Sequence, residues 1–379
     1  MNIKAASRIT RLALLLVPAL AAAPASAQQQ KQAPITGDII IRQEWTDDFF
    51  TQQPDPVPSH RTRFWIRPKF EVETSLLRMG LGADASYSTD KNLEPEGVTL
   101  PLTLIRDNYI SRNIRLDIAY LGTNLGAMKV DVGRMPMPFR LTNMIWDQDL
   151  RIQGGAAQWT VYQGSTAEPM VKASGIYSRG SHVFADSEDP EGSSLGEGVT
   201  IAGGSLDLGF GESKRVDFTG TYLEFDKLNL LETKIRRQNT RVGGALVKEY
   251  GVVDLVLRFR TDSPFPMQFV VNGARNRKTE TLRDGIWLTA VLGSLVDGRI
   301  RGEYTYAKMD RDVTVAAYAG DDFFWGTGWL GHRAELAFAQ NPKASFHVIG
   351  QMQQFKDSAN PAERSHWVKR LRLEVRKKL

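Results

Sequence analysis

The stretch RTRFWIRPKFEVE, residues 61–73, separates its side chains into two faces. Its odd positions carry Arg61, Arg63, Trp65, Arg67, Lys69, Glu71 and Glu73, and its even positions carry Thr62, Phe64, Ile66, Pro68, Phe70 and Val72. Successive side chains of a β-strand point to opposite faces, so a strand here has one charged and one apolar face. This pattern is typical of a strand between water and lipid, and also of an amphipathic strand in a soluble sheet.

The same alternation recurs along most of the chain. Apolar residues alternate with charged residues in five further stretches, at residues 114–120, 253–260, 299–306, 333–338 and 370–376. A soluble β-sandwich turns one face of each strand toward a shared core and usually keeps long charged arrays to a minority of strands. The repetition therefore favours an all-β fold, a transmembrane antiparallel β-barrel with water inside and lipid outside.

The alternating segments also give a strand count. About sixteen begin near residues 61, 76, 112, 126, 155, 168, 199, 214, 237, 252, 266, 283, 298, 330, 343 and 366. Short turns, as at residues 209–213, alternate with long polar connections, as at residues 179–197 and 310–329, which is typical of periplasmic turns and extracellular loops. The alternation fails between residues 199 and 262, so eighteen strands is the alternative count.

The amino-terminal residues indicate export. Lys4, Arg8 and Arg11 precede an apolar run from Leu12 to Ala23, and Ala25-Ser26-Ala27 has the pattern of a cleavage site. We predict a cleaved signal peptide at residues 1–27, because the apolar run is shorter than the ~20 residues that an anchor helix needs. Residues 28–60 are interpreted as a periplasmic lead-in whose strand-like piece at residues 38–44 allows a first short strand, and residues 61–379 as the barrel.

Composition narrows the function classes. The chain has 48 Lys and Arg and 43 Asp and Glu, and the signal peptide holds three basic and no acidic residues, so the mature chain carries 45 − 43 = +2. This near balance gives no reason to expect a nucleic-acid partner, which requires a strong basic stripe. The chain has no cysteine, which excludes disulfides and thiolate metal sites. No cofactor or metal is expected.

Two blocks of the sequence resemble the family of Gram-negative outer-membrane porins. The first comprises IRLDIAY at residues 114–120, GRMPMPF at 133–139, WDQDL at 146–150 and GGAA at 154–157, and the second runs from Glu303 to His332. The family is related by fold to the general and phosphate-selective trimeric porins. The resemblance implies a passive channel for small hydrophilic solutes, a homo-oligomer that is a trimer, and an outer-membrane location in contact with lipid and lipopolysaccharide. Unlike such barrels, which usually end in an aromatic residue, this sequence ends Arg376-Lys377-Lys378-Leu379.

The long connection at residues 135–153 is the candidate constriction. Strand alternation stops near Arg134, and Pro136 and Pro138 block a continuing ladder. In a membrane barrel, a loop of this length can fold into the lumen and set the bore. The candidate constriction residues are Arg134, Arg140, Asp147, Asp149 and Arg151; the alternative for Arg134 is a structural pair with an acid on a neighbouring strand.

Arginine-rich faces suggest a second functional feature. The candidate lumen-facing basic residues are Arg61, Arg63, Arg67, Arg370, Arg372 and Arg376, which become neighbours where the first and last strands close the barrel. They form either a solvated wall whose charges pair with acids or a basic ladder that draws anions through the channel. An anion- or phosphate-selective channel is therefore the alternative function.

An outer-membrane hydrolase is the third hypothesis. The five histidines are scattered without metal-ligand or catalytic spacing, and His332 near Asp321 and Asp322 is the best enzyme candidate. The aromatic residues Phe323, Phe324, Trp325 and Trp329 suggest an interface girdle or loop-packing cluster rather than a sugar-stacking platform. We therefore expect a channel and not an enzyme.

Overall fold

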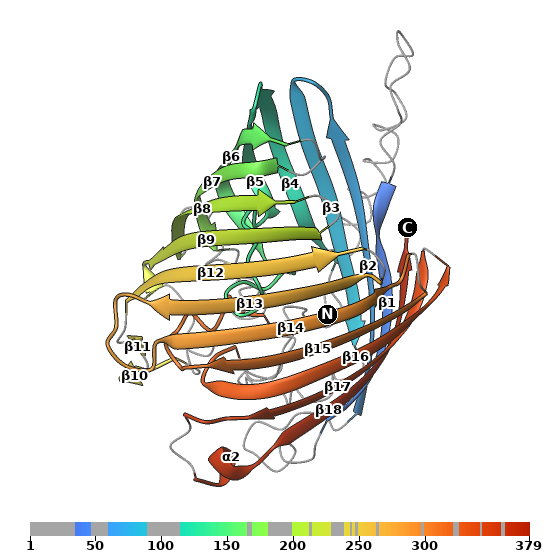
Figure 1. Ribbon diagram of the computed structural model, residues 1–379, viewed down its shortest axis with the longest axis vertical. Coiled ribbons are helices and arrows are strands. Elements are labelled where there is room, and N and C mark those ends of the chain that lie inside the picture. Colours follow the sequence, from blue (N-terminus) through green and yellow to red (C-terminus); the bar gives the residue numbers. More distant parts are fainter. Residues whose placement is uncertain are drawn as a thin grey trace, which may run out of the picture. The chain divides into compact units, whose positions relative to one another are not determined.

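The structure is a computed structural model that describes residues 35–46, 60–88, 114–164, 169–180, 199–211, 214–228, 239–242, 245–246, 249–262, 265–296, 299–320, 326–341, 343–357 and 361–379. Within these residues, sixteen antiparallel strands form a closed barrel (Figure 1). The predicted signal peptide and parts of the predicted lead-in, residues 28–34 and 47–59, lie outside the described residues. Among the described residues, no helix is both long enough and apolar enough to cross a membrane.

The barrel strands follow the chain in order. They are β1 (Ile35–Thr46), β2 (His60–Glu73), β3 (Leu77–Ser88), β4 (Ile114–Leu125), β5 (Met128–Pro136), β6 (Arg151–Gln163), β7 (Pro169–Gly180), β8 (Thr200–Phe210), β9 (Lys214–Asp226), β12 (Tyr250–Thr261), β13 (Met267–Asn276), β14 (Asp284–Ser294), β15 (Ile300–Met309), β16 (Trp329–Asn341), β17 (Ala344–Gln354) and β18 (Val368–Lys378). Each pairs with its sequence neighbours, and β1 closes the ring by pairing with β18. The short helix α2 (Pro361–Ser365) precedes β18.

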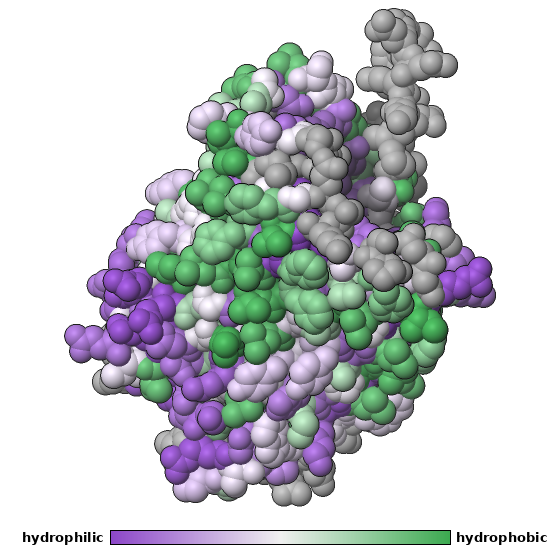
Figure 2. Space-filling model, in the orientation of Figure 1, coloured by the Kyte–Doolittle hydropathy of each residue, from purple (hydrophilic) through white to green (hydrophobic). Residues whose placement is uncertain are grey.

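The barrel has its polar side chains inside and its apolar side chains outside. On β12, for example, Asp254 is buried, while Leu255 and Leu257, which point to the opposite face, are exposed. On β18, Arg370 and Arg372 are buried while Leu371 is exposed. Figure 2 shows hydrophobic residues over the middle of the strands and hydrophilic residues gathered toward their two ends. This inverted distribution is that of a transmembrane barrel with a polar lumen.

Short turns lie at one end of the barrel and long connections at the other. Asp38 of β1 pairs with Lys378 of β18, so both ends of the barrel chain lie at the short-turn end. The turn between β4 and β5 comprises two residues, Gly126 and Ala127. The connections β5–β6 and β15–β16 open at the other end, called the loop end below. This asymmetry confirms the predicted alternation of turns and loops.

The strand count of sixteen is confirmed, although one predicted strand is absent from the barrel and one barrel strand, β1, was not among the predicted starts. Near residue 237 the chain forms β10 (Arg241–Val242) and β11 (Ala245–Leu246), which make a separate two-stranded sheet. Strands this short cannot cross a bilayer, which takes about 9–11 residues. The strand-like piece at residues 38–44 is instead the complete barrel strand β1. Its three consecutive isoleucines, Ile39 to Ile41, hide the alternation.

The expected alternation also breaks within β4. The pairing of β3 with β4 shifts between Gly82 and Ala83, so Asp117 and Ile118 are both buried. A β-bulge adds one residue to a strand and reverses the faces beyond it. Tyr120 therefore turns inward, where its hydroxyl donates to Glu71, and Leu121 turns outward. The uniform alternation predicted for residues 114–120 is therefore wrong beyond Asp117, because a bulge leaves no signal in an alternating sequence.

A hydrophobic core lies inside the barrel toward the loop end. It joins inward residues of the strands, such as Ile201, Phe225 and Trp287, to residues of two connections. The β5–β6 connection supplies Met144, Ile145, Trp146 and Leu150, and the β15–β16 connection supplies Val313, Val315 and Tyr318. The two connections thus pack their apolar side chains against apolar residues that the strands turn inward at this end.

Candidate functional site

The β5–β6 connection contacts strands on opposite sides of the barrel. On one side, the Asp149 carboxylate lies 2.5 Å from the Arg67 guanidinium of β2. On the other, the Arg258 guanidinium of β12 donates to the carbonyl oxygen of Arg140 at 2.5 Å. Seven strands separate β2 from β12 in either direction around the ring. A segment that touches both strands with inward side chains must cross the interior.

Two residues of the connection fix it to further strands. The Arg140 guanidinium lies 3.5 Å from Asp217 of β9, and the Thr142 hydroxyl donates to Asn272 of β13. Neither contact is with a sequence neighbour, so both hold the segment against the β9–β13 wall. The Arg140 side chain nevertheless keeps 33% of its surface accessible. Its charge is therefore available to a solute in the interior.

The other candidate constriction residues have different surroundings. The Arg151 guanidinium lies 2.8 Å from Asp117 of β4, and both side chains are buried. Arg134 donates from Nε to the backbone carbonyl of Asp117 at 2.9 Å. Asp147 is buried and accepts the backbone N–H of Asp149 at 2.8 Å, which shapes a turn. Arg140 and Asp149 thus keep accessible surface, Asp147 and Arg151 are buried, and the Arg134 guanidinium is held against the backbone of β4.

The six candidate basic residues lie on β2 and β18, on either side of β1. Glu44 of β1 is surrounded by arginines: Arg61 at 2.6 Å, Arg372 at 2.7 Å and Arg370 at 3.6 Å. These four side chains are almost completely buried. Arg63 is opposite Arg42 in the register, and the Arg42 guanidinium lies over the ring of Trp65. A carboxylate among arginines compensates charges that would otherwise repel each other.

Nearer the short-turn end, the same wall becomes accessible. Arg67 binds both Asp38 at 2.7 Å and Asp149, and Arg376 lies 2.5 Å from Glu374. The Arg376 side chain is 35% accessible and the Asp149 side chain 34% accessible. Of the six predicted residues, three gather around Glu44 (Arg61, Arg370, Arg372), Arg63 lies beside Arg42, and Arg67 and Arg376 lie further along the wall.

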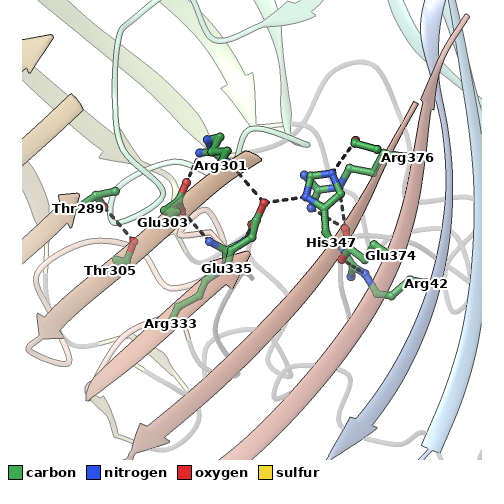
Figure 3. Close-up of polar contacts among 11 residues, drawn as sticks. Arg42, Thr289, Arg301, Glu303, Thr305, Arg333, Glu335, His347, Glu374 and Arg376 are labelled. Atoms are coloured by element: carbon green, nitrogen blue, oxygen red, sulfur yellow. Dashed lines mark hydrogen bonds and ion pairs between the residues drawn. The ribbon is translucent and has the colours of Figure 1, made fainter. Parts of the chain in front are cut away.

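The wall continues onto β15, β16 and β17 as a second polar network (Figure 3). Arg333 binds Glu303 at 2.6 Å and also Glu335, and Arg301 binds the same two carboxylates. His347 Nδ1 lies 2.8 Å from Glu335, and its Nε2 lies 2.8 Å from the Ser345 hydroxyl. The inner wall thus alternates positive and negative groups rather than presenting one sign.

Inward positions on β1, β2 and β18 still carry an excess of positive charge. They hold nine Lys and Arg and five Asp and Glu, which gives 9 − 5 = +4. The basic residues are Arg42, Arg61, Arg63, Arg67, Lys69, Arg370, Arg372, Arg376 and Lys378, and the acidic residues are Asp38, Glu44, Glu71, Glu73 and Glu374. Clustered charge of one sign concentrates counter-ions near a wall. This side of the interior therefore carries a net positive charge.

Several site residues were not found from the sequence. Arg42 and Glu44 lie in β1, outside the predicted barrel, and Arg258 was noted only as part of an alternating segment. The sequence signal for β1 was its alternation of Asp38, Arg42 and Glu44. Within the described part of the chain, no group of three or more metal-ligating side chains could hold a metal ion. Phe323, Phe324, Trp325 and the predicted His332 partners Asp321 and Asp322 lie outside the described residues.

Comparison with known proteins supports the fold. No protein-family model matches the sequence, and no curated protein sequence matches it. Among solved structures, the high-pH structure of Pseudomonas putida OprB is 11% identical, with a TM-score of 0.56, over 91% of this chain and 94% of that chain. A triple mutant of the Rhodopseudomonas blastica porin is 12% identical, with a TM-score of 0.50, over 91% of this chain and 99% of that chain. The chain therefore has the porin fold.

Proposed function

We propose that this chain is an outer-membrane porin, a passive diffusion channel for small hydrophilic solutes. The observation that carries the proposal is a closed, inside-out barrel whose polar interior is crossed by the β5–β6 connection. The crossing loop narrows the interior, and accessible charged groups remain on the loop itself, at Arg140 and Asp149, and on the wall, at Arg376. The chain would lie among outer-membrane lipid and lipopolysaccharide, as a homo-oligomer.

Planar-bilayer recording tests this proposal. The refolded mature chain, beginning at residue 28, is added to a bilayer in symmetric salt. We expect stepwise current increases that are linear in voltage, because a passive pore has no preferred direction or saturable step. A correctly folded, heat-modifiable barrel that inserts into the bilayer and yet gives no current would contradict the channel.

A preference for anions is the second candidate property. Its support is the excess positive charge of the inward positions on β1, β2 and β18, where Arg67 and Arg376 border accessible space. In a potassium chloride gradient, the reversal potential should have the sign of chloride permeation. Inhibition of the chloride current by added phosphate would show that the preference extends to phosphate. A reversal potential with the sign of potassium permeation would contradict the anion preference.

A barrel hydrolase is the competing class, and one described group bears on it. Ser345, His347 and Glu335 have the donor–acceptor order of a hydrolase triad. Arg301 and Arg333 also bind Glu335, and their positive charges weaken its ability to stabilise a protonated imidazole. We infer that the group is part of the polar wall. A fluorophosphonate probe should leave Ser345 unlabelled, and covalent labelling that disappears in Ser345→Ala would favour the enzyme.

A further inference from the structure

The β15–β16 connection turns into the barrel, unlike a solvated external loop. Residues Asp310–Gly320 follow β15, and Asp312, Val313, Thr314 and Val315 have no accessible surface. Connections usually lie on the protein surface, because their polar backbone groups need water. A connection this buried must satisfy its backbone groups with protein partners, and its contacts show which partners these are.

The segment is hydrogen-bonded to the β5–β6 connection. The backbone N–H of Asp147 donates to the carbonyl oxygen of Tyr318 at 2.8 Å, and the N–H of Gly320 donates to that of Asn143 at 2.7 Å. The rings of Trp146 and Tyr318 stack with centroids 5.3 Å apart and planes 2° apart. The two connections thus form one packed unit, which we call the double loop: residues 137–150 and 310–320.

Two glycines permit this close packing. A Cβ on Gly320 would lie 2.6 Å from the Cβ of Asn143, closer than real contacts allow. A Cβ on Gly285 of β14 would lie 2.9 Å from the Met144 sulfur and 3.1 Å from Val313. The first glycine lets the two halves of the double loop meet, and the second lets both halves rest on the same strand.

Asp312 fixes the segment to the wall. Its Oδ1 accepts the Tyr250 hydroxyl at 2.8 Å and the Thr240 backbone N–H at 2.9 Å, and its Oδ2 accepts the Thr240 hydroxyl at 2.5 Å. Its backbone carbonyl accepts the Asn276 side chain at 3.0 Å. A buried carboxylate with three donors is strongly held, because charge-assisted hydrogen bonds are stronger than neutral ones.

Asn239 secures the backbone on both sides of Asp312. Its amide nitrogen donates to the carbonyls of Arg311 at 2.7 Å and Thr314 at 2.9 Å, and its amide oxygen accepts the N–H of Ala316 at 2.9 Å. Three of the four hydrogen-bonding sites of this amide therefore serve the segment. Together with Asp312, it gives residues 311–316 a defined conformation inside the barrel.

From these contacts we propose that Asp310–Gly320 is the second half of the constriction, and that Asp312 is its positioning residue. The inference rests on the proposed channel. The β5–β6 connection has its own contacts to the wall at Arg140, Thr142 and Asp149. Its middle, Asn143–Asp147, is hydrogen-bonded to the second segment. The bore therefore depends on both loops, and release of the second segment frees the middle of the first.

The test combines Asp312→Ala with a cysteine reporter. The chain has no cysteine, so Met144→Cys gives a single thiol at a position with no accessible surface. In the Asp312→Ala background, we expect thiol labelling to be faster by at least about tenfold, because loss of charge-assisted hydrogen bonds raises the open population by that order. Single-channel conductance and open-channel noise should both increase. Glu280→Ala, which removes an exposed carboxylate from the β13–β14 connection, is the matched control and should change neither.

The outcomes separate this proposal from the proposed function. Unchanged labelling and conductance in a heat-modifiable Asp312→Ala barrel would overturn the two-loop constriction. If the wild-type protein gives no current, the proposed channel function is contradicted. Labelling of Met144→Cys then still decides whether Asp312 holds the β5–β6 connection in place. If Asp312→Ala does not fold, Tyr318→Ala decides on the same readouts, because it removes the ring stacked on Trp146 and keeps the Asp312 contacts. It should also accelerate labelling, and an unchanged rate would overturn the proposal.

Discussion

At the scale of the residue, the interior charges act in compensated groups. Glu44 has three arginine neighbours on two strands, and Glu335 has two arginines and a histidine. Each carboxylate holds together strands that would otherwise carry adjacent like charges. Such a group therefore contributes mainly by preventing repulsion between the arginines. The free-energy cost of leaving buried charges unpaired is larger than the net stabilisation by a buried ion pair.

Replacement of Glu44 tests this role. Glu44→Gln keeps the side-chain shape and removes the charge among Arg61, Arg370 and Arg372, so we expect the free energy of unfolding to fall by about 3 kcal/mol. The measurement is the urea midpoint of the refolded barrel, followed by the loss of heat-modifiable mobility. Glu249→Gln, on an exposed side chain 3.7 Å from Lys278, should change it by less than about 0.5 kcal/mol. Equal midpoints for Glu44→Gln and wild type would contradict the compensation.

Arg140 and Arg151 should respond differently to the same substitution. In Arg140→Ala, Asp217 keeps its ion pair with Arg215 at 2.7 Å, so we expect the barrel to stay stable. The loss of an accessible positive charge should shift the reversal potential toward that of a cation-selective channel. Arg140→Lys keeps the charge and should keep the selectivity. In Arg151→Ala, buried Asp117 loses its guanidinium partner, so stability should fall by roughly 3 kcal/mol. Indistinguishable selectivity of Arg140→Ala and wild type would place Arg140 outside the solute path.

At the scale of the element, alternation predicted the strands well and their irregularities poorly. The period-two signal is repeated by every strand, so fifteen of the predicted starts correspond to barrel strands. The bulge at Asp117 and the triple isoleucine of β1 break the signal locally. The inward turn of residues 310–320 could not be predicted, because it depends on partners far away in the sequence, such as Asn239 and Asn143.

Removal of the middle of the β5–β6 connection tests its place in the bore. A deletion of Thr142–Asp149 removes the bonds to β13 and β2 and the stacked Trp146. The remaining strands keep their ladder pairing, so we expect a folded barrel with a conductance clearly above that of Arg140→Ala. A deletion of the exposed helix α2, Pro361–Ser365, from the β17–β18 connection is the control and should leave conductance near wild type. Equal conductance in both deletions would mean that the constriction lies elsewhere.

At the scale of the whole molecule, polarity is inverted and charge is unevenly distributed. Residues 28–379 have a net charge of +2, whereas the inward positions of β1, β2 and β18 alone reach +4. Composition averages over faces and therefore cannot reveal a charged wall. Composition and alternation together predicted the class of fold. The arrangement of the wall required the register that closes β1 onto β18.

Closure through β1 gives the last prediction. Without β1, the arginines of β2 and β18 lose their ion-pair partners Asp38 and Glu44. Strands β2 and β18 also lose their backbone hydrogen bonds to β1, so the remaining fifteen strands have two open edges. Unpaired strand edges are not tolerated in a bilayer, because their backbone groups have no water to bind.

We therefore expect a chain refolded from residue 28 to migrate faster unboiled than boiled and to resist urea extraction from membranes. A chain that begins at residue 47 should do neither. A chain that begins at residue 33, two residues before β1, is the control for truncation itself and should behave like the first. Heat-modifiable mobility of the residue-47 chain would show that the barrel closes without β1, with β2 paired directly to β18.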